Sequence, residues 1–126
     1  MANLATVTNI QPGLVLNSNL GTSMTTLLNG PNSNTKVIKI TSIIVANVDG
    51  TNDADVSVYL TKYPTYNSAI AKTVTVPADS TLVVLSKDNP IYLNYDPNAS
   101  YLSAQASQVN DLTVTVTYEE ITCASA

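Results

Sequence analysis

The side chains most able to do chemistry lie in IIVANVDGTNDADVSVYL (residues 43–60), where Asp49, Asp53 and Asp55 fall within seven positions. Clustered carboxylates can bind a cation. An EF-hand calcium loop, however, needs glycine at its sixth position and glutamate at its twelfth. DGTNDADVSVYL instead places glycine second and leucine twelfth. Asn, Asp and Gly between two strand-like patterns are typical of a turn. We therefore predict a turn with no metal and no cofactor, a looser carbonyl-and-carboxylate site being the alternative.

Catalytic groups are the second possibility, and the sequence argues against them. The chain contains no histidine, so Ser-His and Cys-His nucleophile activation are both absent. Ser86 and Lys87 are adjacent in SKDNP, where turn chemistry explains both residues. Glu119 and Glu120 are also adjacent, so on a strand they point to opposite faces. We predict that the protein is not an enzyme.

Tyrosines form the third group of candidates. Tyr63 and Tyr66 flank a proline in TKYPTYNSA, while Tyr92, Tyr95 and Tyr101 gather in PIYLNYDPNASYL. Tyrosines at sheet ends can close a sandwich, anchor a protein interface or stack on a sugar. Capping is the default interpretation, and Tyr63, Tyr66 and Tyr95 are the candidate interface tyrosines.

The charge balance limits the choice of partners. Five lysines and no arginine accompany nine carboxylates, which leaves a net charge of −4. Phosphate contacts need more cations than this, so we expect no nucleic-acid partner. The longest apolar run, residues 43–46, is far below the ~20 residues that span a bilayer, and the N-terminus lacks a signal-peptide pattern. We expect no membrane association and a protein assembled in a cytoplasm.

Strict alternation indicates the elements that must position these residues. In ADVSVYLT, Val56, Val58 and Leu60 share one face; in DLTVTVTYEE, Val114 and Val116 do the same. Period-two alternation predicts half-buried strands. Other strand-like runs occupy residues 35–47, 69–76, 80–86, 90–94 and 100–106, with weaker ones at 5–9 and 23–28. Short strands separated by Gly and Pro predict an all-β, antiparallel sandwich with jelly-roll character.

The length of 126 residues suits one domain. We predict a sandwich over 35–121 and a C-terminal tail over 122–126, in which Cys123 is a small tail residue or, alternatively, forms an intermolecular bridge. Residues 1–34 are rich in asparagine and glycine and are interpreted as an irregular arm or as edge strands. We hypothesise that this segment lies along a neighbouring subunit by strand addition. Its candidate contact residues are Leu14, Val15, Leu16 and Leu20.

Three stretches carry a family resemblance: ITSIIVANVDGTNDADVSVYL, KTVTVPADSTLVVLSKDNPIYLN and LTVTVTYEEI. They resemble small virion structural proteins of tailed bacteriophages, notably cyanophages, in which ANVDGT, a VPA turn, DNPIYL and a closing YEEI strand follow one another. The resemblance covers residues 36–121. After IYL the relatives tend to carry an acidic residue and a Gly-Asp turn, whereas this chain reads NYDPNASYL.

The resemblance implies a non-enzymatic building block of the virion, assembled in the host cytoplasm. Its first implied role is a capsid decoration (cement) protein that stabilises the shell; a neck, tail or fibre component is the alternative, and a carbohydrate-binding module is a third option. The implied partners are the major capsid protein or other virion proteins. Copies of the chain itself are also implied, a trimer being one option.

Overall fold

The computed structural model describes residues 2–62, 66–97 and 100–124. In these residues the chain forms nine strands and one short 3-10 helix. The elements are η1 (Leu4–Thr6), β1 (Val7–Asn17), β2 (Thr25–Asn29), β3 (Lys36–Asn47), β4 (Ala54–Lys62), β5 (Tyr66–Val76), β6 (Thr81–Leu85), β7 (Ile91–Asn94), β8 (Ser100–Ala106) and β9 (Leu112–Cys123).

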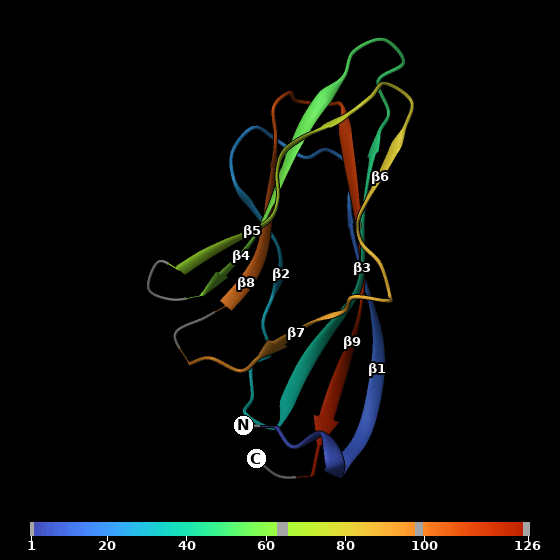
Figure 1. Ribbon diagram of the computed structural model, residues 1–126. Coiled ribbons are helices and arrows are strands. Elements are labelled where there is room, and N and C mark those ends of the chain that lie inside the picture. Colours follow the sequence, from blue (N-terminus) through green and yellow to red (C-terminus); the bar gives the residue numbers. More distant parts are fainter. Residues whose placement is uncertain (1, 63–65, 98–99, 125–126) are drawn as a thin grey trace.

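The strands form two antiparallel sheets that pack as two layers (Figure 1). One sheet has the order β1-β9-β3-β6, with β7 also paired to β3, and the other has the order β2-β8-β4-β5. Two four-stranded orders that alternate between layers in this way are those of a jelly roll, with β7 as an addition. The prediction of an all-β antiparallel sandwich with jelly-roll character is confirmed.

The core lies between the sheets and contains the residues that alternation placed there. Val56, Val58, Val114 and Val116 are almost fully buried, and Leu60 is half-buried against them. With no Phe or Trp in the chain, aliphatic side chains from both sheets fill this space. Close packing of branched side chains on pleated sheets is what the Val-rich strands favour.

A bulge in β3 changes which of its residues face the core. Ile38 and Ile40 are buried in the first half of the strand, whereas Ile43 and Val45 are buried in the second half. The register with β9 shifts between Ile40 and Ser42. One extra residue in a strand reverses the alternation beyond it. Both halves of residues 35–47 therefore contribute side chains to the same core.

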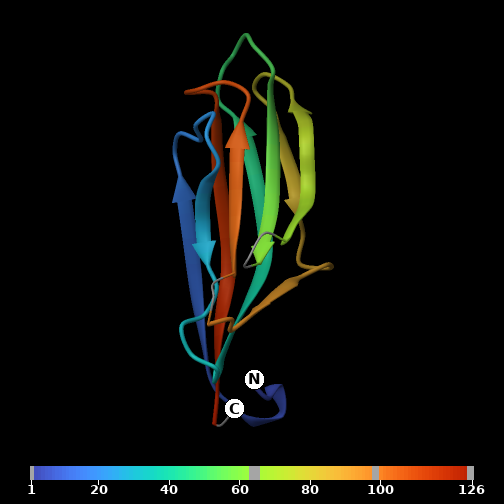
Figure 2. The same cartoon turned by 90° about the vertical axis from the view of Figure 1, so that its left-hand side faces the viewer.

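The N-terminal segment belongs to the sandwich as edge strands, one on each sheet. β1 pairs with β9 along its length, and β2 pairs with β8. Figure 2 shows both strands running beside their partners at the same margin of the molecule. The sequence allows either an arm or edge strands over residues 1–34, and the structure shows edge strands. β1 supplies the hydrogen-bonding partner that β9 needs on that side.

The C-terminal tail is shorter than predicted. β9 continues to Cys123, whose N–H donates to the carbonyl of Thr35 at 2.8 Å. The Cys123 side chain is buried with Val37 and Ile121. Cys123 is therefore part of a strand and of a small second apolar cluster, and its prediction as a tail residue is wrong.

Candidate interaction surfaces

Strand β1 carries an exposed aliphatic stripe. Leu14 is 58% exposed and Leu16 is 69% exposed, while Val15 between them is half-buried against the core. This follows from alternation, which sends successive side chains to opposite faces. Leu20 was predicted as a contact residue, but it is fully buried in the chain's own core. It lies in the loop that follows β1, where its N–H donates to the Leu112 carbonyl at 2.9 Å and its side chain packs in the core, so it is unavailable to a partner.

The aliphatic stripe continues across the five-stranded sheet. Leu16 pairs with Thr115, Thr115 with Ile44, and Ile44 with Val83, so one row crosses β1, β9, β3 and β6. Side chains of directly opposed residues lie on the same face. Val83 is 58% exposed, so this face is accessible in the monomer.

We call this surface the outer sheet face. It comprises Leu14, Leu16, Ile44, Val83, Thr115 and Thr117. All six side chains are uncharged. The sequence analysis missed Ile44 and Val83, although alternation in SIIVAN and STLVVLS places them opposite buried neighbours.

Ion pairs mark the end of the same sheet. Lys39 Nζ lies 3.9 Å from Glu119 Oε1, and Lys36 Nζ lies 3.3 Å from Glu120 Oε1. All four side chains are about one third exposed, so each pair stabilises the fold only weakly. They join β3 to β9, which gives the paired glutamates a structural role.

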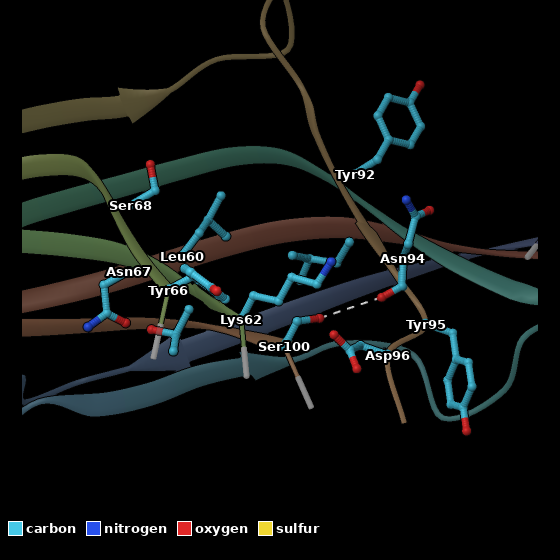
Figure 3. Close-up of a pocket in the computed structure, with 12 residues that line it drawn as sticks. Leu60, Lys62, Tyr66, Asn67, Ser68, Tyr92, Asn94, Tyr95, Asp96 and Ser100 are labelled. Carbon is cyan, nitrogen blue, oxygen red and sulfur yellow. Dashed lines mark hydrogen bonds between the residues drawn. The ribbon is translucent and has the colours of Figure 1, made fainter. Parts of the chain in front are cut away.

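The predicted tyrosines fall partly together. Tyr66 from β5 and Tyr95 after β7 line one cavity, together with Tyr92 of β7 (Figure 3). Tyr63 lies outside the described residues. Tyr66 and Tyr95 are far apart in sequence, and the approach of β5 to β7 brings them to the same place. This cavity is a second candidate surface.

The three aspartates of the opening motif bind backbone and hydroxyl groups. Asp49 Oδ1 accepts hydrogen bonds from the N–H groups of Thr51 at 2.7 Å and Asn52 at 3.1 Å, and these contacts lower the pKa of Asp49. Such contacts favour the ionised form of a carboxyl group.

The two other aspartates tie this loop to its surroundings. Asp53 Oδ1 accepts from the N–H of Ala78 at 3.0 Å, and Asp55 Oδ1 accepts from the Thr75 hydroxyl at 2.7 Å. The contacts of Asp49 and Asp53 are those of a turn between strands, as the sequence predicted, whereas Asp55 lies on β4 and its contact joins β4 to β5. Among residues 2–62, 66–97 and 100–124, no group of three or more His, Cys, Asp or Glu side chains could hold a metal ion.

A buried carboxyl group faces this turn. Asp111, which precedes β9, is buried, and it lines the same small cavity as Asp49. Desolvation, and then the negative charge of Asp49, raise the pKa of Asp111. The N–H of Val48 donates to the backbone carbonyl of Asp111 at 2.8 Å, which joins the β3–β4 turn to the β8–β9 loop. Protonation of Asp111 removes the repulsion between its carboxylate and that of Asp49.

Comparisons with known proteins reveal a fold likeness. No protein-family model and no curated sequence matches the chain. A solved structure of a protein described under "Bacillus endospore appendages form a novel family of disulfide-linked pili" is similar, with a TM-score of 0.51 and 9% sequence identity. The likeness covers 91% of this chain and 89% of that chain. At this identity it concerns the fold alone. In the part of the chain that the structure describes, no helix is long and apolar enough to cross a membrane.

Proposed function

We propose that this chain is a non-enzymatic structural subunit of a virion, and specifically a capsid decoration protein that assembles through its outer sheet face. The observation that carries the proposal is the row of uncharged side chains across β1, β9, β3 and β6, exposed at Leu16 and Val83 and half-buried between them. The sequence resemblance to small phage virion proteins supports the proposal that the protein is part of a virion. Jelly rolls are also a common architecture of viral capsid domains, which is a fold-level analogy.

The outer sheet face has the properties of a contact between copies. Burying Leu14, Leu16 and Val83 removes apolar surface from water, which is favourable at roughly 25 cal/mol per Å². None of its side chains is charged, so burial has no ionic desolvation cost. In a twofold contact the same residues meet each other, and uncharged patches avoid like-charge repulsion there. A second copy of the chain therefore suits this face.

A pilus subunit is the second candidate, because the fold likeness extends over 91% of the chain. The comparison protein's pili are described as disulfide-linked. This sequence has one cysteine, Cys123, and it is buried in β9. One cysteine per copy can join copies only in pairs, so a disulfide-linked series of copies does not follow from these residues.

Sedimentation velocity of the purified protein tests the contact. Wild type is expected to sediment as an oligomer and Leu16→Glu as a monomer, because the charge would have to be buried at the contact. Val48→Glu is the matched control, since Val48 is 58% exposed but lies outside the outer sheet face. A monomeric wild type, or a Leu16→Glu variant that still oligomerises, would contradict the proposed contact.

The copy number of the protein in purified virions tests the role. A number comparable with that of the major capsid protein supports decoration of the shell. A far lower number indicates a neck, tail or fibre component. Absence from purified virions would reject the virion proposal as a whole.

A further inference from the structure

A cavity of about 350 Å³ is lined by residues 60–62 of β4, residues 66–68 of β5 and residues of β7. Leu60 and Leu93 contribute its apolar lining, and both belong to the strands that flank it. Its volume lies at the lower end of the range typical of small-ligand sites. This cavity is separate from the outer sheet face, whose residues do not line it.

Exposed aromatic rings surround this cavity. Tyr66 is 70% exposed, Tyr92 is 45% exposed and Tyr95 is 39% exposed. Among the tyrosines that the structure describes, these are the ones with large exposure, and all three line the cavity. In Figure 3 the Tyr92 and Tyr95 rings project to the right of the β7 segment, one near each end of it. Rings with accessible faces offer apolar stacking surfaces, and their hydroxyls offer hydrogen bonds.

The polar side chains of the cavity are mostly neutral. Asn94 of β7 contributes an amide group to the lining, and Ser68 of β5, two positions from Tyr66 and so on the same face of the strand, contributes a hydroxyl. The amide supplies two donors and a carbonyl acceptor, and the hydroxyl can both donate and accept. Ser100 approaches from β8, and its hydroxyl donates a long hydrogen bond of 3.5 Å to the backbone carbonyl of Asn94. Donors and acceptors thus lie between the aromatic rings.

The formal charges in the lining cancel. Lys62 and Asp96 both line the cavity and contribute one positive and one negative charge. A balanced lining does not favour a strongly anionic ligand such as a phosphate, which selects clustered cations. It suits a neutral ligand with many hydroxyl groups and apolar C–H faces.

We propose that this cavity binds a short neutral saccharide, stacked on Tyr66 and Tyr92 and hydrogen-bonded by Ser68 and Asn94. Sugar C–H faces pack on tyrosine rings, while ring hydroxyls bond to amide groups. This activity goes beyond the structural role proposed above. A subunit of an assembled surface that also binds glycans would hold the particle to a carbohydrate-coated surface, and many copies would multiply a weak single-site affinity.

A glycan array followed by titration tests the proposal on the wild-type chain. The array carries neutral and anionic oligosaccharides, and the soluble probes for titration are maltotriose, cellotriose, tri-N-acetylchitotriose and the anionic 3′-sialyllactose. Wild type is expected to bind at least one neutral glycan saturably and to prefer neutral over anionic probes. No saturable binding to any neutral glycan, or a preference for anionic ones, would overturn the proposal.

Variants then locate the site. Tyr66→Ala and Tyr92→Ala are each expected to weaken binding at least about tenfold, equivalent to about 1.4 kcal/mol, whereas Tyr66→Phe, which keeps the ring, retains most of it. Tyr101→Ala is the control, since Tyr101 is a half-buried tyrosine of β8 outside this cavity. Unchanged binding by both alanine variants rejects the site.

A measurement on wild type remains decisive if a variant fails to fold. Tyrosine ring resonances followed by NMR should shift for Tyr66 and Tyr92 on addition of the bound trisaccharide, and shifts confined to other tyrosines would reject the site. Leu16→Glu should bind the glycan as a monomer with wild-type single-site affinity. Failure of the assembly proposal is thereby distinguished from failure of this one.

Discussion

The ring of Tyr118 on β9 occupies the space where Gly13 of β1 would carry a side chain. The two residues are directly paired in the antiparallel register. A Cβ built on Gly13 would overlap ring atoms Cε1, Cε2 and Cζ of Tyr118. No positive φ is recorded for Gly13, so the glycine is required here for space and not for backbone conformation. An aromatic ring over a glycine on an edge strand fastens that edge to the sheet.

Gly13→Ala is expected to destabilise the fold, because the Tyr118 ring must move away from the inner face. The expected loss is about 1–3 kcal/mol, as for overpacking of a core, measured by urea unfolding. A double-mutant cycle provides the control: in a Tyr118→Ala background the same change should cost much less. Equal costs in both backgrounds would show that the ring is not the obstacle.

Removal of residues 2–20 is expected to unfold the domain or lower its melting temperature sharply. The deletion takes away β1, the partner of β9, together with the buried Leu20. Removal of residues 2–5, which lie before β1 and leave the strand intact, is the matched control. Circular dichroism reports the fold of both proteins. A folded, thermally unaltered 2–20 deletion would mean that β1 is dispensable and can act as an arm.

Val116→Ala should lower the free energy of unfolding by about 1–3 kcal/mol through lost burial and the cavity left behind. Val116 is fully buried between the sheets. Thr115→Ala changes the adjacent residue of the same strand, which lies on the outer sheet face. It should lower the free energy of unfolding by less than Val116→Ala does. Chemical denaturation compares the two. A larger loss for Thr115→Ala would contradict the assigned faces of β9.

Asp111→Asn is expected to raise the melting temperature at pH 7. The pKa of Asp111 is raised above 3.8 in the folded state, so the native protein holds this proton more tightly than the unfolded chain. Its stabilising effect is therefore present at pH below 3.8 and is lost as the pH rises through the raised value. The amide removes the repulsion by Asp49 and can still donate a hydrogen bond to it.

The gain from Asp111→Asn should thus disappear at low pH, where Asp111 is protonated in any case. Asp49 behaves in the opposite sense, because its pKa is lowered and its contribution is lost as the pH falls through that lowered value. Asp88→Asn, an exposed carboxylate elsewhere, is the control. The melting temperatures of wild type, Asp111→Asn and Asp88→Asn are measured between pH 3 and pH 7. A gain independent of pH would exclude protonation of Asp111 as its cause.

Local pattern was sufficient for much of the fold. Alternation in residues 55–60 and 112–118 identified two strands and their buried faces, because the direction of a side chain on a strand depends only on its neighbours. The turn role of Asp49 and Asp53 also followed from local chemistry. β1 was harder to recognise, since Pro12 and Gly13 interrupt its pattern; proline is tolerated there because β1 is an edge strand.

Only the tertiary structure decided which distant residues meet. The register that places Gly13 beneath Tyr118 joins opposite ends of the chain, and the approach of β5 to β7 assembles the tyrosine cavity. The burial of Leu20 likewise depends on contacts with distant strands, and the raised pKa of Asp111 depends on its burial and on the charge of Asp49, which lies far earlier in the chain. Alternation determines the face that a residue occupies, but strand pairing between distant segments selects its neighbours, and that choice minimises the free energy of the whole sandwich.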